Sequence, residues 1–263
     1  MRLAALCVCL ATSAAAQERH DCIMDPSLVI EVGSAVDGLL KEAFVTRGDD
    51  IAKGQLIARL DGRVQEAALE YARELAQSGS TVDIAQNRLE LAQSEVNRAE
   101  ELLNRNLIAD AVVQTLRSRA SEAELQLQQA EIDQRLASLE QARVEAQLDQ
   151  RNIISPIDGI VITRMMSPGE YVFSQAPVAQ LAQINPIHVE VFLPTELYAT
   201  LSKGGVGIVF PAEPVGGEYE AEIIAIDRVF DAASDTFGVR LALQNSDGAL
   251  PTGLDCEVMF EAG

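Results

Sequence analysis

The cysteines and histidines are the residues of this chain that could support redox or metal chemistry. The 263-residue sequence contains four Cys and two His. Cys7 and Cys9 lie in an apolar N-terminal stretch, whereas Cys22 and Cys256 stand near the two ends of the remainder. His20 lies two residues before Cys22, but too few further ligands are nearby to complete a metal site. We therefore expect neither a metal nor a cofactor.

The N-terminal stretch indicates the compartment and therefore the state of the cysteines. Residues 1–16 contain one Arg, an apolar run and a small-residue run, the pattern of a secretory signal peptide cleaved before Gln17. The apolar run is shorter than the about 20 residues that a membrane-spanning helix needs. We expect a periplasmic protein, with a retained N-terminal anchor as the alternative. In an oxidising compartment an even pair of cysteines is more often bridged than free, which predicts a Cys22–Cys256 disulfide. Two separate buried thiols are the alternative.

No pattern of residues predicts catalysis. The sequence has no nucleophile elbow around a Ser and no cluster of carboxylates with a base. His188 alternates with the apolar residues Ile187 and Val189, as a residue on the surface of a strand would. The formal charge is -20, and the few basic residues form no patch that would neutralise phosphates. We therefore expect neither an enzyme nor a nucleic-acid-binding protein.

An internal repeat organises the elements of the chain. Residues 34–60 align without a gap with residues 155–181, at a constant offset of 121. Each copy has the composition of a few short strands joined by tight turns. Because one copy is too small to bury its apolar face alone, we expect the two copies to pack as one small β-sandwich. The identical pairs are Ser34/Ser155, Asp37/Asp158, Gly38/Gly159, Gly48/Gly169, Ala58/Ala179 and Leu60/Leu181.

The residues between the two copies predict two long helices. Residues 62–151 are rich in Ala, Gln, Glu and Leu and contain no Pro. Apolar and small residues recur there at heptad spacing, which is typical of a coiled coil. The first predicted seam is Ala68, Tyr71, Leu75, Ser78, Val82, Ala85, Leu89, Ala92, Val96, Ala99 and Leu103; the second is Leu116, Ala120, Ala123, Leu127, Ala130, Gln134, Ala137, Gln141, Val144 and Leu148.

Two similar helices joined by a short turn should fold back as an antiparallel hairpin. Each arm of about 40 residues would extend roughly 60 Å. Asp61 and Asp110 are candidate helix caps, and Gly79 is a candidate bend. Because the hairpin would leave the sandwich after the first repeat and return before the second, we expect it to project as a rod.

The residues after the second repeat predict a small antiparallel barrel or sandwich. Their apolar segments are separated by turns rich in Gly, Pro, Asn and Asp. We expect a short helix from Thr195 and a turn at the Gly-rich residues 204–207. The expected strands are Ile187–Pro194, Tyr219–Ile226, Phe237–Asn245 and Asp255–Ala262.

With its parts in this order, the sequence resembles a known family. The halves SAVDGLL and VTRGDDIAKGQLIARLD, and SPIDGIV and SPGEYV, are similar to the two halves of the biotinyl/lipoyl fold. The stretches INPIHVEVFLPTEL and DTFGVRLALQN resemble the β-barrel of periplasmic adaptor proteins, the membrane fusion proteins of tripartite efflux pumps of the resistance-nodulation-division type. The resemblance implies an elongated α+β fold. It would comprise a split lipoyl-like β-sandwich, interrupted by a long antiparallel α-helical coiled-coil hairpin, and then a small antiparallel β-barrel.

The expected domain order follows from this resemblance, with two departures. Family members usually carry Arg-Thr where this chain has Asp235-Thr236, and many continue into a further membrane-proximal domain. Because the sequence ends at Gly263, we expect the contacts with the transporter to be made by fewer residues or in another way. The expected parts are a signal peptide (1–16), an N-terminal strand packing on the barrel (17–27), a first lipoyl-like half (28–61), the hairpin (62–151), a second half (152–183) and the barrel (184–263).

The resemblance also implies a partner site at the hairpin tip. In the family an Arg, a Leu four residues later and a Ser seven residues after that meet an outer-membrane duct; Arg98 and Leu102 fit this spacing, but Ala109 replaces the Ser. A solvated Arg98 and a Leu102 that only flanks the seam are the alternatives. Leu107 and Ile108 are the stronger candidates, because apolar residues at an exposed turn tend to mark a contact.

The family role would be that of a structural coupler. The expected partners are an inner-membrane transporter, an outer-membrane channel protein and further copies of the chain in a ring. A type I secretion adaptor is the close alternative, but it would normally carry an N-terminal membrane-spanning helix. A lipoyl or biotinyl carrier subunit is the alternative from another class; it needs a modifiable Lys between the two halves, and Lys41, Lys53 and Lys203 all lie elsewhere. A self-associating coiled coil without a partner is the simplest alternative.

Overall fold

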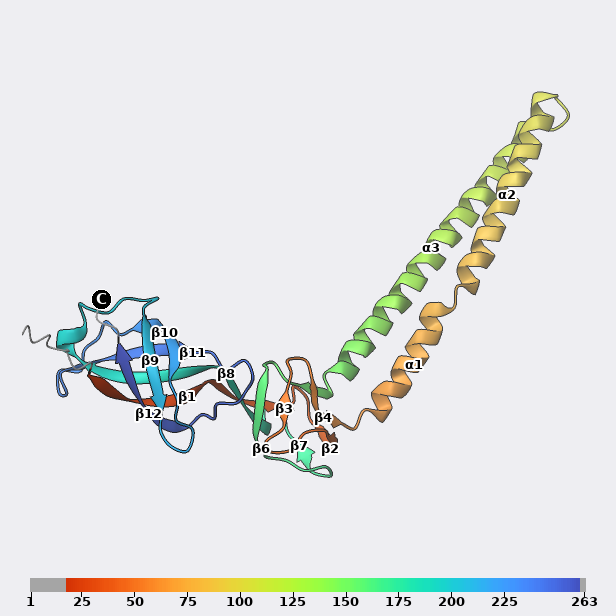
Figure 1. Ribbon diagram of the computed structural model, residues 1–263. Coiled ribbons are helices and arrows are strands. Elements are labelled where there is room, and N and C mark those ends of the chain that lie inside the picture. The colour runs from red at the N-terminus through yellow and green to blue at the C-terminus, as the bar shows by residue number, and fades with distance from the viewer. Residues whose placement is uncertain (1–17, 261–263) are drawn as a thin grey trace, which may run out of the picture.

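The computed structural model describes residues 18–260, so the predicted signal peptide lies outside the described residues. The molecule is elongated, with a β-barrel at one end, a smaller β-module in the middle and a helical hairpin projecting from that module (Figure 1). This agrees with the expected combination of a β part and a long hairpin.

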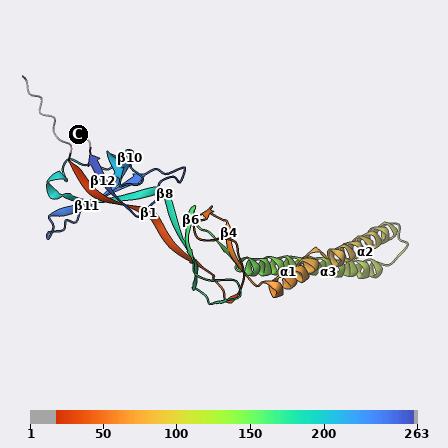
Figure 2. The ribbon, with the colours of Figure 1, turned by 60° about the horizontal axis from the view of Figure 1, so that its bottom comes forward.

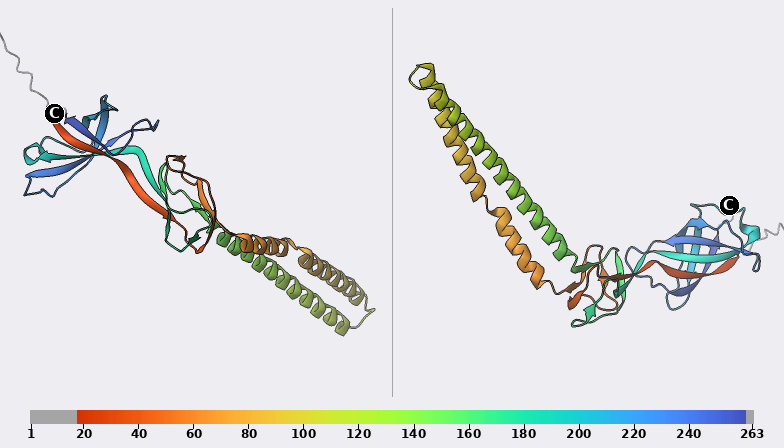
Figure 3. Two further views of the ribbon diagram at one scale, coloured as in Figure 1. Left: turned by 90° about the horizontal axis from the view of Figure 1, so that it is seen from below. Right: turned by 180° about the vertical axis from the view of Figure 1, so that it is seen from behind.

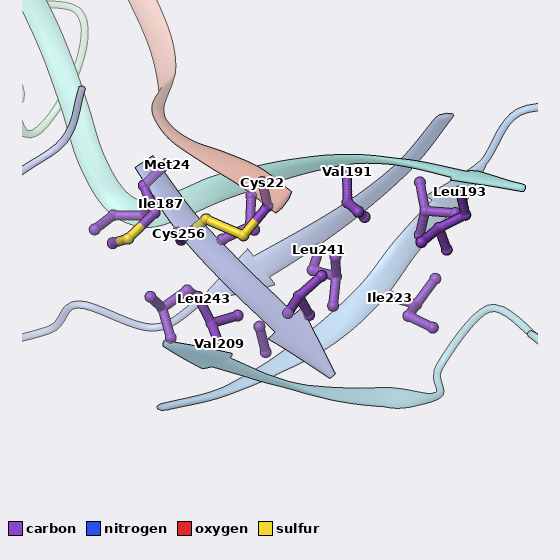
Figure 4. Packing of buried hydrophobic residues seen from close by; sticks show 14 of the residues in the cluster. Cys22, Met24, Ile187, Val191, Leu193, Val209, Ile223, Leu241, Leu243 and Cys256 are labelled. Atoms are coloured by element: carbon purple, nitrogen blue, oxygen red, sulfur yellow. A yellow bond between two sulfur atoms is a disulfide. The ribbon is translucent and has the colours of Figure 1, made fainter. Parts of the chain in front are cut away.

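Six strands form the barrel. The sheet runs β1-β12-β9-β10-β11-β8, and β1 also pairs with β8, which closes the cylinder. Buried side chains from all six strands fill its interior (Figure 4). The strands are β1 (Arg19–Gly33), β8 (Pro177–Pro194), β9 (Val206–Pro211), β10 (Tyr219–Ile226), β11 (Thr236–Leu243) and β12 (Leu254–Phe260), and one 3-10 turn, η1 (Thr195–Leu197), follows β8.

Strand β9 was not predicted, because its Gly-rich start was interpreted as a turn. The turn is confined to the residues before Val206, where β9 begins. Gly207 is needed inside the strand, since a Cβ atom there would lie 2.8 Å from Leu241 Cδ2 and 3.1 Å from Val258 Cγ2. The glycine therefore lets the barrel walls approach closely.

The predicted disulfide between Cys22 and Cys256 is confirmed. The two residues face each other in the antiparallel register of β1 and β12, with a Cα–Cα distance of 4.8 Å. Both are buried in the barrel core (Figure 4). The bond therefore fixes the first strand of the barrel to its last strand.

Strands β1 and β8 are long enough to belong to both β units. They run side by side from the barrel into the middle module (Figure 2). The expected boundaries at residues 27/28 and 183/184 fall inside these continuous strands. The β1–β8 register shifts between Pro26 and Leu28, so an irregularity in the ladder marks the junction on β1.

The middle module consists of two four-stranded layers that the repeat explains. One layer is β1-β8-β6-β3 and the other is β5-β4-β2-β7. The repeat offset of 121 residues relates the second half of β1 to β5, β2 to β6, β3 to β7 and β4 to β8. Replacing each strand by its repeat-related strand converts the strand order of one layer into that of the other. The further strands are β2 (Gly38–Ala43), β3 (Asp50–Ile51), β4 (Leu56–Leu60), β5 (Asn152–Ile154), β6 (Gly159–Arg164) and β7 (Tyr171–Val172).

Equivalent aspartates lock the two halves together. The Asp158 carboxylate accepts a hydrogen bond from the backbone N–H of Lys53 at 2.8 Å. At the repeat-related position, the Asp37 carboxylate accepts one from the backbone N–H of Ser174. Because each aspartate reaches into the other half, the identity of Asp37 and Asp158 reflects a structural requirement.

Three helices form the hairpin. Helices α1 (Arg63–Gln77) and α2 (Ser80–Asn104) make up the first arm, and α3 (Asp110–Asp149) is the second (Figure 3). The first arm is broken at Ser78–Gly79, where a bend was expected. The expected Asp caps were wrong, since Gly62 and Ala109 occupy the N-cap positions. The backbone N–H of Arg63 nevertheless donates to the Asp61 carboxylate at 3.2 Å.

The predicted seams are correct in α2 and α3 but wrong in α1. Every predicted seam residue of α2 and α3 is buried or half-buried. In α1, Leu69 and Ala72 are buried, whereas Tyr71 and Leu75 are 68% and 47% exposed. The break between the helices explains the error, because it shifts the helical phase by one residue relative to an uninterrupted heptad count.

Candidate partner interface at the hairpin tip

The tip turn begins with a well-formed helix end. The backbone N–H of Leu107 donates to the Leu102 carbonyl at 2.9 Å, and that of Asn106 donates to the Leu103 carbonyl at 2.8 Å. Asn106 has a φ of 57°, the left-handed conformation that Asn tolerates better than most residues. This pairing is the Schellman motif, so the backbone of the turn is held in a defined position.

The turn presents apolar side chains to solvent. Leu107 is 65% exposed and Leu102 is 40% exposed, while Ile108 is half-buried. Val113, in the first turn of α3, is fully buried and anchors the end of the hairpin. Val113 was missed because the seam count started at Leu116, although the position three residues earlier continues the same stripe.

Arg98 and Leu102 share a face of α2, because residues four apart are neighbours on a helix. That face points away from the buried seam, and Arg98 is exposed. The nearby Glu100 instead faces α3, where the Arg117 guanidinium donates to its carboxylate at 2.6 Å. The structure thus brings Arg98 and Leu102 together, with Leu107 linked to the same helix end through its backbone.

Ala109 is exposed and sits at the N-cap of α3. Its φ of -81° and ψ of 145° are those of a residue that caps a helix, but alanine has no side-chain oxygen to do so. Asp110 lies in the first helical turn, where its negative charge complements the helix dipole. A hydroxyl at position 109 would therefore serve the helix itself, whatever else it contacts.

The other end of the molecule also exposes apolar side chains. The end of β8 and the β10–β11 connection lie at the barrel end away from the hairpin (Figure 1). Phe192 and Val229 are 68% and 85% exposed there and line a hollow of about 430 Å³. Phe237 lines the same hollow and packs with Tyr198 and Phe230, with ring centroids 5.0–5.9 Å apart.

Asp235, which departs from the family pattern, has a structural role at this barrel end. Its φ is 56°, so it occupies a turn position that favours Asp, Asn or Gly. The Thr195 hydroxyl donates to its carboxylate at 2.8 Å, and the Thr195 backbone N–H donates to its carbonyl at 3.1 Å. These bonds fix the β10–β11 connection to η1.

Two kinds of feature are not found between residues 18 and 260. No group of three or more His, Cys, Asp or Glu side chains is placed to hold a metal ion. No helix in this part of the chain is both long and apolar enough to cross a membrane.

Solved structures and curated proteins resemble this chain. MacA from Actinobacillus actinomycetemcomitans superposes with a TM-score of 0.73, at 19% identity, over 94% of this chain and 78% of MacA. The membrane fusion protein Spr0693 from Streptococcus pneumoniae R6 gives 0.61 at 17% identity, over 94% and 99% of the two chains. At these identities the likeness concerns the fold.

Multidrug resistance protein MdtA of Escherichia coli O45:K1 is 26% identical over 230 residues. The match covers 84% of this chain and 52% of MdtA, so the chain spans about half the length of such relatives. The model of the CzcB-like barrel-sandwich hybrid domain matches residues 28–183, which include both repeat copies and the hairpin between them. Because this match covers more than half of the sequence, the chain belongs to the CzcB-like barrel-sandwich hybrid family of membrane fusion proteins.

Proposed function

We propose that the protein is a periplasmic adaptor that couples an inner-membrane efflux transporter to an outer-membrane channel. The hairpin tip meets the channel, the far end of the barrel meets the transporter, and copies of the chain associate through their hairpins and barrels. The name of MdtA, a multidrug resistance protein, supports efflux as the process served.

One observation carries this proposal: apolar side chains are exposed at both ends of an elongated molecule, Leu107 at the tip and Phe192 and Val229 at the far end of the barrel (Figure 1). Helix α3 alone has 40 residues and therefore extends roughly 60 Å. A protein with contact surfaces so far apart is suited to hold two partners at a distance. A catalyst would instead need its functional groups gathered in one cleft.

Finer features are part of the same proposal. We interpret the middle module as lipoyl-like and the hairpin as a two-stranded coiled coil, with the domain boundaries expected from the sequence. The repeat relation between the two layers supports the lipoyl-like interpretation. The buried stripe shared by α2 and α3 supports the coiled-coil interpretation. The hairpin joins β4 to β5, the place where a carrier subunit would need its modified Lys, which argues against the carrier alternative.

Periplasmic location is a proposal that rests on the signal-peptide pattern and is consistent with the disulfide. Cell fractionation and N-terminal sequencing test it. A mature chain beginning at Gln17 in the periplasmic fraction supports the proposal, and a reduced chain in the cytoplasm contradicts it.

The coupling role is tested by capture from intact cells after cross-linking, with the attached membrane proteins identified by mass spectrometry. Leu107→Glu places a charge at the tip and should abolish recovery of an outer-membrane protein while leaving the inner-membrane transporter attached. Ser118→Glu is a matched control, because it adds the same charge at an exposed site two turns into α3. Recovery of only soluble enzymes would contradict the adaptor role.

A further inference from the structure

The hollow at the barrel end combines apolar and acidic residues, a lining that the coupling role does not require. It has a volume of about 430 Å³ and lies where the outer surface of β8 and β11 meets the β10–β11 connection. We call it the barrel-end hollow. Its lining residues are Phe192, Asp227, Val229, Asp231, Ser234, Thr236, Phe237 and Gly238.

Gly238 forms the floor of the barrel-end hollow. In the register of β8 and β11 it is the direct partner of Phe192. A Cβ atom on Gly238 would collide with the Asp227 carboxylate and would lie 3.7 Å from the Phe192 ring. The carboxylate and the ring therefore lie next to each other above a residue that has no side chain. Glycine at this position keeps the space between them open.

Hydrogen bonds hold the lining of the hollow in place. The Asp227 backbone N–H donates to the Gly238 carbonyl at 2.8 Å. Across the β10–β11 connection, Asp231 and Thr236 exchange two backbone hydrogen bonds of 2.9 and 3.3 Å. The Ser234 and Thr236 hydroxyls share a further hydrogen bond of 2.8 Å. The hollow is therefore largely preformed, which reduces the entropic cost of binding a ligand there.

The barrel-end hollow carries negative charge without a cationic partner from the described part of the chain. The ion pairs formed between residues 18 and 260 involve neither Asp227 nor Asp231. Hydrogen bonds from the Ala233 backbone N–H and from the Ser234 side chain lower the pKa of the Asp231 carboxyl, so this group stays ionised at neutral pH. Two carboxylates that line one hollow repel each other, and a cation between them would relieve the repulsion.

The lining favours an organic cation over a metal ion. Calcium and magnesium need a nearly complete shell of oxygen ligands, and no such group of three or more His, Cys, Asp or Glu side chains exists within residues 18–260. Phe192 and Val229, which are 68% and 85% exposed, supply aromatic and aliphatic surface instead. An aromatic ring beside a carboxylate attracts a positive charge that is attached to hydrocarbon.

We propose that the barrel-end hollow binds a small organic cation, with its ammonium group between Phe192 and Asp227 and its apolar part on Val229. A volume of about 430 Å³ is in the range of small-molecule pockets, so the hollow can take up most of a molecule and not only the end of one side chain. This site goes beyond the coupling role, because holding two membrane proteins together needs no solute site. Under the proposed function, the bound cation would lie where the barrel meets the transporter.

Binding of a cationic probe to the purified protein tests this inference. Benzyltrimethylammonium joins a positive charge to an aromatic ring, and benzyl methyl sulfone is a neutral molecule of nearly the same shape. Each is titrated into the 15N-labelled protein, and the backbone amide signals of Asp227 and Gly238 are followed by NMR. The cation should shift both signals with saturation, and the sulfone should bind about tenfold more weakly, because it lacks the charge that the carboxylates and the ring attract.

Variants of the lining identify the groups that bind the cation. Phe192→Leu removes the aromatic ring and Asp227→Asn removes one carboxylate charge, and each should weaken binding about threefold or more. Both side chains are exposed, so both variants should fold. Glu222→Gln is the matched control, because it removes the same charge from an exposed position of β10 outside the lining. The control should bind the cation as the wild type does.

Four results would overturn the inference. Equal affinity for the cation and the sulfone would show that charge is not recognised, and a loss in Glu222→Gln as large as in Asp227→Asn would show that only the net charge of the protein attracts the probe. Calcium that binds more tightly than benzyltrimethylammonium would assign the hollow to a metal ion. Arginine amide that binds as tightly would assign it to a basic side chain of a protein partner.

The measurement is made on the isolated protein, so its outcome is separate from that of the coupling role. A protein that recovers both membrane partners but does not bind the cation would overturn this inference and leave the coupling role intact. Cation binding without recovery of membrane partners would support the inference and contradict the coupling role.

Discussion

At the scale of single residues, the tip contains one position for which a partner-binding role and a helix-capping role can be tested separately. The family resemblance predicts a partner-binding hydroxyl at the position of Ala109, and the structure places this residue at the N-cap of α3. The two roles are separable, because capping acts in the isolated protein and partner binding does not. His188 is a second informative residue, since its titration reports on the outer surface of the barrel.

Ala109→Ser should stabilise the hairpin. The backbone at this position already has the conformation of a cap, so a Ser oxygen can accept from a free N–H of the first turn. We expect a gain of about 1 kcal/mol in the free energy of unfolding, measured by urea denaturation followed by circular dichroism. Ala111→Ser is the matched control, because it adds the same hydroxyl inside the helix. Equal effects of the two variants would contradict the capping role.

Stability should fall as the pH drops below about 6.5. Burial lowers the pKa of His188 from its ordinary value of 6.5, the Arg240 charge lowers it further, and Glu190 partly opposes both. The unfolded chain therefore takes up a proton at a pH where the folded chain resists it, so acid favours unfolding. Urea unfolding at pH 7.5, 6.5 and 5.5 should show this decline, and His188→Gln should flatten it. If the unfolding free energy of His188→Gln falls with pH as steeply as that of the wild type, groups other than His188 cause the decline.

At the scale of elements, the break in the first arm has the largest consequences. It separates α1 from α2, shifts the helical phase and leaves an apolar stripe exposed. Strand β1 is equally important for the β part, because it belongs to both the barrel and the middle module and carries one cysteine of the disulfide.

Inserting one Ala between Ser78 and Gly79, together with Gly79→Ala, should join α1 and α2 into one helix. One added residue corrects the phase, so Leu69 and Ala72 remain in the seam of a continuous helix. Replacing Gly by Ala in a helix adds about 1 kcal/mol of helix stability. Far-UV circular dichroism should show more helix and a higher melting temperature. Deleting Ser78 shifts the phase the other way, and equal behaviour of the two variants would contradict the phase-shift explanation.

Removing the disulfide should destabilise the barrel. Cys22 and Cys256 are separated by 234 residues, and a cross-link closing a long loop contributes typically 2–5 kcal/mol. The Cys22→Ser/Cys256→Ser double variant should unfold at lower denaturant concentration, and the reduced wild-type protein should match it. If the variant unfolds like the oxidised wild type, the bond does not stabilise the barrel.

The sequence predicted those elements whose signal is local and periodic. The repeat identified both halves of the middle module, and the α3 seam was correct because no break interrupts its heptads. The prediction of the α1 seam was wrong, because the break at Ser78–Gly79 shifts the buried positions by one residue and the heptad pattern of the sequence does not reveal this shift. Strand β9 was not predicted, because Gly207 is typical of a turn in the sequence alone and its role in the close packing of the barrel walls is visible only in the structure. Of the tip, the apolar exposure of Leu107 was predicted, but the anchor Val113 was not.

At the scale of the whole molecule, the chain is elongated and is built around an internal two-fold repeat. Each layer of the middle module contains strands from both halves of the repeat. The chain leaves the module after β4 and re-enters it at the neighbouring strand β5. A long hairpin can therefore be inserted without disturbing the module. The continuous strands β1 and β8 attach the barrel on the other side, which places two exposed apolar surfaces at the two ends.

Photo-cross-linking from both ends in intact cells tests this account most directly. A photoreactive amino acid replaces Leu107 at the tip in one variant and Val229 at the barrel end in another, and the cross-linked proteins are identified after separation of the two membranes. The account predicts an outer-membrane protein attached at position 107 and an inner-membrane transporter attached at position 229. Adducts to proteins of the same membrane from both positions, or only to soluble proteins, would contradict it.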